Sequence, residues 1–149
     1  MSIEIISLSE SMAENVHNLE CLCFPDPYSE SVLRKDFANP SNICFCAVCC
    51  DILAGYCICS TVLDEAELQR IAVSDKFRGQ GIASLMVDYL IEQCNFKGIS
   101  RMYLEVRESN TPARRLYEKH NFIQTGIRKA YYRDNGENAV LYALSLSRR

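Results

Sequence analysis

The chain has 149 residues, which fits one domain and is long enough to bury a hydrophobic core. Its 48% hydrophobic residues, 23% charged residues and formal net charge of -3 are ordinary for a globular protein, and they argue against nonspecific nucleic-acid binding, which needs clustered positive charge. The first residues lack a signal-peptide pattern, and no stretch has the roughly 20 apolar residues that cross a bilayer. We therefore expect a single domain over residues 1–149 in the cytoplasm, with no membrane partner and no direct nucleic-acid partner.

The first two thirds of the chain alternate between strand and helix patterns. A helix with N-cap Ser9 ends before Pro25, because a residue that precedes proline disfavours helical backbone. A second short helix begins at Ser29, and residues 51–55 join two β-rich runs as a hairpin. The strands expected here cover residues 3–8, 42–50, 55–64 and 65–74. A long helix over 81–98 ends at Gly98, and its apolar stripe consists of Ile82, Leu85, Met86, Tyr89 and Leu90.

The last third adds a strand, a helix and a pair of strands. The strand presents Met102, Leu104 and Val106 on one face and Tyr103, Glu105 and Arg107 on the other. A helix runs from Pro112 to about Lys119, with proline in its first turn. Closing strands over residues 122–132 and 138–146 flank the turn Arg-Asp-Asn-Gly-Glu. The order βααβββαβαββ predicts an α/β fold, a mixed, mostly antiparallel sheet with helices on both faces.

The nine cysteines are a high count for this length. An odd number in a chain without a signal peptide argues against a disulfide framework. Cys44 and Cys46 share one face of a strand, as do Cys57 and Cys59, so a zinc site on the hairpin is an alternative. Their spacing differs from the paired C-x-x-C pattern of zinc sites, and cysteine also packs well as a small hydrophobe. We expect no metal.

A glycine-rich turn joins the strand at 65–74 to the long helix. Its residues are Arg78, Gly79, Gln80, Gly81, Ile82 and Ala83. Glycines let a backbone approach a ligand closely, and the N–H groups of a helix N-terminus suit a pyrophosphate. The turn matches neither the P-loop nor the G-x-G-x-x-G motif, because Ser84 stands where the third glycine belongs. Taken alone, it is equally well explained as an ordinary strand-to-helix turn.

Glu105 and Tyr117 form a second candidate site. Glu105 lies in the middle of an expected strand, and Tyr117 follows on the next helix. The simplest interpretation makes Glu105 an exposed residue on the solvated side of a strand and Tyr117 a core aromatic on an amphipathic helix. The alternative is a proton-transfer pair beside a bound cofactor.

Several motifs together resemble the GCN5-related N-acetyltransferase (GNAT) superfamily. Residues 78–83, Arg-Gly-Gln-Gly-Ile-Ala, match its acetyl-CoA signature Q/R-x-x-G-x-G/A. More narrowly, the chain resembles the ribosomal-protein-alanine N-acetyltransferases in Leu-Asp-Glu-Ala at 63–66, Leu-Glu-Val-Arg-x-Ser-Asn at 104–110, Leu-Tyr-Glu at 116–118 and Tyr-Tyr at 131–132. The resemblance runs from about residue 27 to the closing strand. The chain departs from it at Ala83, where glycine is frequent, and at Asn121, which replaces a loop glycine but tolerates the left-handed region.

The resemblance implies an enzyme that transfers the acetyl group of acetyl-CoA to a protein N-terminal α-amine, that of alanine on a basic small-subunit ribosomal protein. An α-amine has a pKa of about 7.7–8.0, so a base must remove its proton before it attacks the thioester. The resemblance assigns Glu105 as this base and Tyr117 as the acid that protonates the departing thiolate. No covalent enzyme intermediate is needed, so the cysteines are not required as nucleophiles.

The resemblance also assigns binding residues. The backbone of Ile71, Ala72 and Val73 would run along the pantetheine arm, the turn from Arg78 to Ser84 would bind the pyrophosphate, and Asn110 would bind the pantetheine while also capping its helix. Tyr131 and Tyr132 are candidates for peptide binding, since aromatic residues are favoured at recognition sites. The acidic residues Asp64, Glu65 and Glu67 would attract a basic peptide, although a solvated turn explains them as well. His120 is expected at the surface, without a catalytic part.

Three alternatives stay open. The same chemistry can act on a small amine, because this fold accommodates many acceptors. A non-catalytic acyl-CoA-binding module is a second alternative, although such a module would need neither Glu105 nor Tyr117. A zinc-binding structural protein is a third, and it rests on the cysteines alone.

Overall fold

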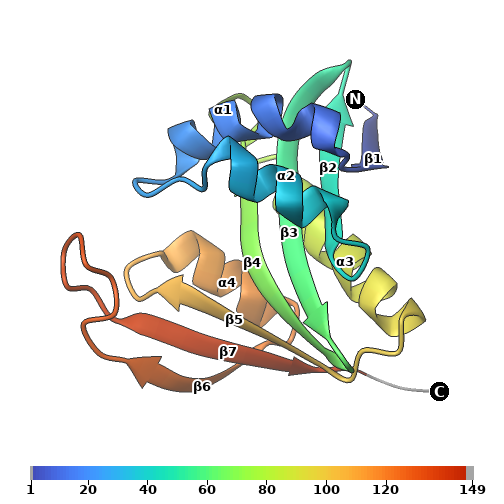
Figure 1. Cartoon of the computed structure of the whole chain (residues 1–149). Coiled ribbons are helices and arrows are strands. Elements are labelled where there is room, and N and C mark those ends of the chain that lie inside the picture. Colours follow the sequence, from blue (N-terminus) through green and yellow to red (C-terminus); the bar gives the residue numbers. More distant parts are fainter. Residues whose placement is uncertain (1, 147–149) are drawn as a thin grey trace.

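The computed structural model describes residues 2–146, so residue 1 and residues 147–149 of the expected domain lie outside the described residues. Its seven strands form one sheet in the order β1-β2-β3-β4-β5-β7-β6 (Figure 1). The strands are β1 (Ile3–Ser7), β2 (Ile43–Cys49), β3 (Ile52–Val62), β4 (Glu65–Val73), β5 (Arg101–Arg107), β6 (Ile123–Arg128) and β7 (Ala139–Ser145). The helices are α1 (Ala13–Cys23), α2 (Glu30–Ala38), α3 (Ile82–Phe96) and α4 (Thr111–Lys119), with the short 3-10 helices η1 (Glu10–Met12) and η2 (Asp75–Phe77). The predicted order βααβββαβαββ is confirmed.

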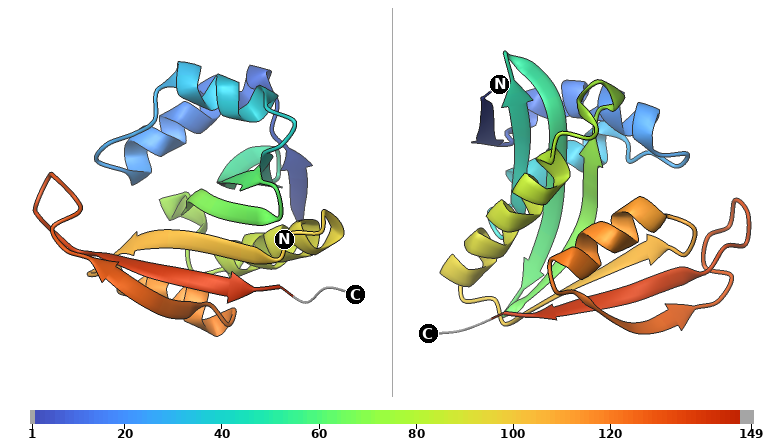
Figure 2. Two further views of the ribbon diagram at one scale, coloured as in Figure 1. Left: turned by 60° about the horizontal axis from the view of Figure 1, so that its bottom comes forward. Right: turned by 180° about the vertical axis from the view of Figure 1, so that it is seen from behind.

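The sheet is continuous at one end and divided at the other. Neighbouring strands are antiparallel except β4 and β5, which run parallel and pair only over residues 65–67 and 101–103. A parallel pair needs a long crossover connection, and here that connection contains α3. Beyond the paired residues β4 and β5 diverge, so the sheet consists of two halves joined at one end (Figures 1 and 2).

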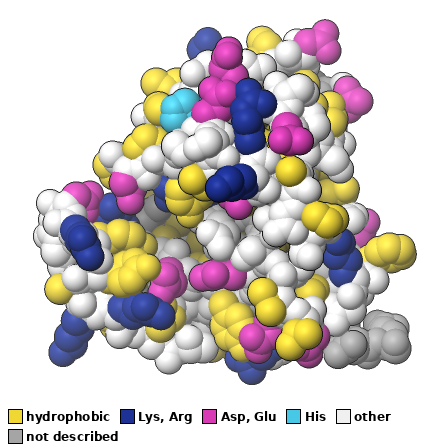
Figure 3. Space-filling model, viewed as in Figure 1, with side chains coloured by type: hydrophobic (Ala, Val, Ile, Leu, Met, Phe, Trp, Pro, Cys, Tyr) yellow, Lys and Arg dark blue, Asp and Glu magenta, His cyan; other side chains and the backbone are white. Residues whose placement is uncertain are grey.

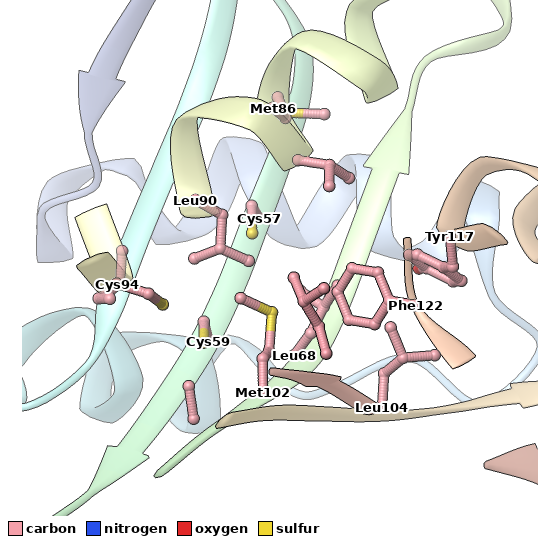
Figure 4. Close-up of a cluster of buried hydrophobic side chains, with 14 of the residues drawn as sticks. Cys57, Cys59, Leu68, Met86, Leu90, Cys94, Met102, Leu104, Tyr117 and Phe122 are labelled. Atoms are coloured by element: carbon pink, nitrogen blue, oxygen red, sulfur yellow. The ribbon is translucent and has the colours of Figure 1, made fainter. Parts of the chain in front are cut away.

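The helices lie on both faces of the sheet, as predicted. Helices α1 and α2 cover one face of the half that contains β4, and α3 and α4 lie on the opposite face (Figure 2). A large hydrophobic core forms under α3 and α4, and a smaller one forms under α1 and α2. Figure 4 shows part of the larger core. The residues that α3 buries are Ile82, Met86, Val87, Leu90 and Cys94.

The predicted apolar stripe on α3 is wrong at one residue, Leu85, which is not buried. Leu85 is 41% exposed. Four of the buried residues of α3 form the row Ile82, Met86, Leu90 and Cys94, and the fifth, Val87, lies on the side of this row away from Leu85. The surface through which the helix packs is therefore rotated toward Val87 relative to the predicted stripe.

The β2–β3 hairpin is tighter than predicted. Its turn is Cys50–Asp51, with φ of 53° and 65°, and residues 52–55 already belong to β3. Gly55 thus lies inside a strand, where an added Cβ would come within 2.5 Å of the carbonyl oxygen of Ala72 and 3.0 Å of the Met86 Cε. Glycine is needed here because β4 and α3 approach β3 closely, and not because the chain turns.

Local predictions at the ends of elements have mixed outcomes. Ser29 is the N-cap of α2 and accepts a hydrogen bond from the Val32 N–H at 3.2 Å. Ser9 instead precedes η1 without a side-chain cap, and α1 begins four residues later, at Ala13. Asn121 has a φ of 71°, which confirms the left-handed turn expected there. Strand β6 ends at Arg128, short of residue 132, because the chain leaves the β7 partner into a loop over residues 129–138, here called the β6–β7 loop.

The cysteines of the hairpin pack as hydrophobic residues. Each predicted pair shares a face, but Cys44 and Cys46 belong to the core under α1 and α2, whereas Cys57 and Cys59 belong to the core under α3 and α4. Burial raises the pKa of the Cys44 thiol to about 12, and it also raises the pKa of Cys57, so both thiols are neutral. A metal ligand or nucleophile needs the thiolate. Within residues 2–146, no three His, Cys, Asp or Glu side chains lie close enough to hold a metal ion.

None of the helices in the described part of the chain is both long enough and apolar enough to cross a membrane.

Candidate active site

A cavity of about 700 Å³ opens where β4 and β5 diverge. It lies between the α1–α2 loop (residues 24–29), the end of β4, the turn before α3, and the end of β5 with α4; Figure 3 shows the hollow between the α1–α2 loop and the β6–β7 loop. The predicted site residues that line it are Ile71, Ala72, Val73, Arg78, Gly79, Gly81, Ile82, Ala83, Ser84, Glu105, Asn110, Tyr117 and Tyr132. Gln80 and Tyr131 are not among its lining residues. The fold thus gathers most of the predicted site from five separate segments.

The end of β4 gives the cavity an unpaired strand edge. On one side β4 pairs with β3 as far as Val73 opposite Gly55. On the other side, within the described residues, its pairing with β5 stops at Glu67. A ligand with an extended, amide-containing arm can bind such an edge by adding itself as a strand.

The turn before α3 gives the cavity a helix N-terminus. Gly79 and Gly81 have φ of 76° and 78°, a region that side-chain-bearing residues rarely adopt, and Gly81 is the N-cap of α3. Because this N-cap has no side chain, it gives the first N–H groups of α3 no side-chain cap of the kind that Ser29 gives α2. The Arg78 guanidinium, three residues before the N-cap, donates from Nε to the Val73 carbonyl at 3.3 Å and lies 3.1 Å from Asp75 Oδ1. This arrangement suits a bound phosphate.

Glu105 lies on the face of β5 that no helix covers within residues 2–146. Its side chain is 23% exposed, and its Oε2 lies 2.9 Å from the Arg128 Nε on β6. The neighbouring Tyr131 is 43% exposed, and the carboxylate of Glu105 is the main cause that raises the pKa of its phenol. A carboxylate on a cavity wall, paired with an exposed cation, is accessible to an incoming amine.

Tyr117 reaches the cavity from α4. Its ring centroid lies 5.6 Å from that of Phe122 and 6.3 Å from that of Tyr142, so the ring is fixed in the core (Figure 4). Burial raises the pKa of its phenol, which therefore stays protonated at neutral pH. The hydroxyl has no hydrogen-bond partner within residues 2–146, yet no fully buried side-chain oxygen in that range lacks one. The hydroxyl therefore opens to the cavity, where it can donate a proton.

Of the predictions at the two ends of α4, the one at the N-terminus is confirmed and the one at the C-terminus is wrong. Asn110 accepts a hydrogen bond from the Ala113 N–H at 3.2 Å, which confirms it as the N-cap, and it also lines the cavity. His120 is not at the surface as predicted, because its side chain is 8% exposed. Its Nδ1 lies 2.9 Å from the Leu116 carbonyl, and its Nε2 lies 3.1 Å from Asp88 Oδ1 and 3.3 Å from Ser84 Oγ. His120 thus ties α4 to the first turns of α3.

Arg107 holds the β6–β7 loop against β5. Its guanidinium makes contacts of 3.1 and 3.0 Å with the two carboxylate oxygens of Asp134 and 3.4 Å with Glu137 Oε1. It also lies 4.0 Å from the ring centroid of Tyr132, and this ring meets that of Tyr131 edge to face at 5.1 Å. The loop, rather than a strand, therefore brings Tyr132 to the cavity.

A buried ion pair, which the sequence analysis missed, fixes the α1–α2 loop. Glu20 is fully buried, and its Oε2 lies 3.0 Å from the Arg70 Nε and 2.9 Å from the Tyr28 backbone N–H, while its Oε1 accepts from the Tyr56 hydroxyl. The Arg70 guanidinium lies between the rings of Phe24 and Tyr28, at 3.9 and 4.1 Å. A signal was present in the sequence, because Glu20 interrupts the apolar stripe of α1.

Comparison with known proteins identifies the family of the chain. The Acetyltransferase (GNAT) family profile matches residues 13–122. The ribosomal protein bS18-alanine N-acetyltransferase of Haemophilus ducreyi is 46% identical over 99 residues, covering 64% of this chain and 68% of that protein. The crystal structure of the ribosomal-protein-S18-alanine N-acetyltransferase from Escherichia coli has a TM-score of 0.92 at 30% identity, covering 99% of this chain and 96% of that chain. Arabidopsis thaliana NAA60 in complex with acetyl-CoA shares the fold, with a TM-score of 0.89 at 17% identity, covering 97% of this chain and 100% of that chain. The chain belongs to the GNAT family of acetyltransferases.

Proposed function

We propose that the protein transfers the acetyl group of acetyl-CoA to the N-terminal α-amine of a cytoplasmic protein that starts with alanine, a small-subunit ribosomal protein. The observation that carries this proposal is the single cavity that combines an unpaired strand edge, a helix N-terminus, a carboxylate and a protonated phenol. Similarity to enzymes named for the alanine of ribosomal protein S18 supports the acceptor.

Acetyl-CoA supplies the acyl group as a thioester. The edge formed by residues 71–73 would bind the amides of the pantetheine arm, with Asn110 near it at the start of α4. The turn from Arg78 to Ser84 would bind the pyrophosphate through backbone N–H groups, the positive end of α3 and the Arg78 guanidinium. Both assignments use groups that line the cavity.

Glu105 and Tyr117 would move the two protons that the reaction requires. An α-ammonium must become an amine before it can attack, and Glu105 would accept its proton, directly or through a water molecule. Tyr117 would donate its proton to the thiolate as it leaves. The raised pKa of Tyr117 supports the second role, because its phenol remains an acid at the pH where the amine is deprotonated. The scheme forms no covalent enzyme intermediate, so it needs no cysteine nucleophile.

The test of the acceptor is acetyl transfer to a panel of compounds, followed by mass analysis. The panel contains a basic peptide that starts with alanine, the same peptide with a blocked N-terminus and an internal lysine, and a set of small amines. We expect acetylation of the free α-amine alone. Transfer only to small amines would contradict the proposed acceptor while leaving the chemistry intact, and CoA binding without any transfer would contradict enzymatic activity.

The roles of Glu105 and Tyr117 are tested by substitutions that keep the size of each side chain and remove its acid or base. Glu105→Gln and Tyr117→Phe are each expected to lower kcat about 100-fold with unchanged affinity for CoA, because general acid–base catalysis contributes at least this factor. Two matched controls should retain wild-type kcat. Glu92→Gln changes an exposed carboxylate on α3, and Tyr103→Phe changes a tyrosine two residues before Glu105 on β5 that does not line the cavity. Wild-type rates in both Glu105→Gln and Tyr117→Phe would show that the protons move by another route.

A further inference from the structure

Two arginines on the uncovered face of the sheet differ in how many anions they meet. In the register of the sheet, Ala139 of β7 lies between Arg107 of β5 and Arg128 of β6. Arg107 is paired with both Asp134 and Glu137, and its side chain is 22% exposed. Within the described residues, Arg128 has one ion-pair partner, Glu105, and its side chain is 58% exposed. Arg107 is therefore held by two ion pairs, whereas Arg128 has a single ion pair.

The pair between Arg128 and Glu105 occupies the position that an acceptor amine needs. Glu105 lines the cavity, and Arg128 reaches it from the open side of the sheet. An α-ammonium has the same charge as a guanidinium and is also a hydrogen-bond donor. The two cations therefore compete for one carboxylate.

We infer that Arg128 acts as a competing cation at the acceptor site: it neutralises Glu105 in the free protein and leaves it when the acceptor ammonium binds. This inference rests on the proposed function in one respect, the binding of an amine at Glu105. The inference adds that the acceptor ammonium replaces the Arg128 guanidinium beside Glu105. The carboxylate therefore has one positive charge beside it before and after the acceptor binds.

The surroundings of Arg128 allow this exchange. The guanidinium carbon lies 5.4 Å from the ring centroid of Tyr131, within the range of a cation–π contact. A guanidinium that moves away from Glu105 can thus stay over this exposed ring instead of losing every contact. Because Glu105 is 23% exposed and Arg128 is 58% exposed, water can replace part of the broken ion pair.

The kinetic test uses Arg128→Gln with a free-amine peptide as acceptor. Removal of the competing cation is expected to lower KM for the peptide about two- to fivefold, the factor that corresponds to a partly exposed ion pair. It should leave kcat within about twofold, because the guanidinium no longer touches Glu105 once the amine has bound. Arg128→Lys retains a competing cation and should keep a KM near that of the wild type. Lys129→Gln removes the same charge from an exposed neighbour and should change neither parameter.

Two measurements separate this inference from the proposed function. Equilibrium binding of the peptide to the CoA-loaded protein should tighten in Arg128→Gln by the same factor as KM, which requires no turnover. In the Glu105→Gln background, Arg128→Gln should have no effect on this affinity, because no carboxylate remains to compete for. If Glu105→Gln keeps wild-type turnover, the base assignment fails while the binding result can still be interpreted.

A different outcome would overturn the inference. An unchanged or higher peptide KM in Arg128→Gln, with a lower kcat, would mean that Arg128 orients Glu105 or binds the peptide. A tightening of equal size in Lys129→Gln would mean that only the overall charge of the surface matters. Thermal unfolding of each variant provides the check that its fold is intact.

Discussion

The two halves of the sheet differ in their covering. In the half that contains β1 to β4, α1 and α2 lie on one face and α3 lies on the other, whereas β5, β7 and β6 have α4 on one face and, among the described residues, no helix on the other (Figure 2). Each half contains a carboxylate–arginine pair near the cavity. In the covered half the pair is Glu20 with Arg70, and in the open half it is Glu105 with Arg128.

The two ion pairs show how burial under helices determines whether a carboxylate can change its partner. Glu20 is 0% exposed and is hydrogen-bonded by Arg70, by the Tyr56 hydroxyl and by a backbone N–H. Breaking such a pair leaves a charge away from water, so the pair acts as a permanent structural link. Glu105 keeps access to water and has a partner that can move, so it can exchange one cation for another. The covered half therefore positions the cavity wall, and the open half contains the carboxylate that we propose as the base.

The largest expected effect is a difference in stability between two single variants, in which the arginine of each ion pair is replaced by glutamine. Arg70→Gln should lower the free energy of unfolding by about 3–5 kcal/mol, because it leaves Glu20 buried without its cation. Arg128→Gln should lower it by no more than about 1 kcal/mol. Urea unfolding measures both values. The double variant Glu20→Gln/Arg70→Gln should recover much of the loss, and equal losses in the two single variants would contradict the comparison.

The next largest effect is expected at the junction of the two halves, in the turn before α3. Gly81→Asp should weaken CoA binding about 100-fold, because the new carboxylate at the N-terminus of α3 competes for its N–H groups and repels the pyrophosphate. Isothermal titration with CoA measures this. Gly81→Asn, without the charge, should lose less affinity. Gly98→Asp has the same φ of 78° at the other end of α3, and it should reduce stability without changing CoA affinity.

A smaller effect should separate the two strand glycines, one in each half. Gly55→Ala is expected to lower the free energy of unfolding by about 1–3 kcal/mol, because the new methyl group would come within 2.5 Å of the Ala72 carbonyl oxygen, which is backbone and cannot rotate away. Gly126→Ala is the matched control, since its Cβ would meet only the Leu141 side chain, at 3.6 Å. Denaturant unfolding compares them. Equal stabilities would mean that β4 can shift away from β3 without cost.

The order of elements could be predicted from local patterns in the sequence, whereas most of the cavity lining was predicted only through the resemblance to the GNAT superfamily. Alternating and helical periodicity placed the strands and helices, and the glycines at 79 and 81 marked a strand-to-helix turn. Asn110 was predicted as an N-cap from its position before Thr111 and Pro112. Each of these properties depends on residues that are close together in the chain.

The features that could not be predicted depend on contacts between distant segments. Gly55 was assigned to a turn, since only the approach of β4 and α3 reveals its packing role. His120 was expected at the surface, because its partners Ser84 and Asp88 lie on another helix. The ion pair between Glu105 and Arg128 crosses β7, so neither residue points to the other in the sequence.

The smallest effect is a pH-dependent loss of stability in the β6–β7 loop of the open half. The anchor of this loop is the set of hydrogen bonds that Glu137 accepts from Ser109 and Arg107. Hydrogen bonds from Ser109, with a further contribution from Arg107, lower the pKa of Glu137 from 4.5 to about 2. Because the pKa is lower in the folded state, this anchor contributes its full stability above about pH 4.5 and loses it as the pH falls toward about 2.

Glu137→Gln should remove this pH dependence. In the wild type, hydrogen exchange at the Ser109 amide, which donates to Glu137 Oε2 at 2.7 Å, should lose protection relative to the core strands as the pH falls through this window. In Glu137→Gln the relative protection should be low and constant, since a neutral amide accepts the same bond more weakly at every pH. Glu14→Gln, an exposed carboxylate on α1, should behave like the wild type. Loss of protection at the same pH in the wild type and in Glu137→Gln would assign the transition to another group, such as Asp134, whose pKa the hydrogen bond from Arg107 also lowers.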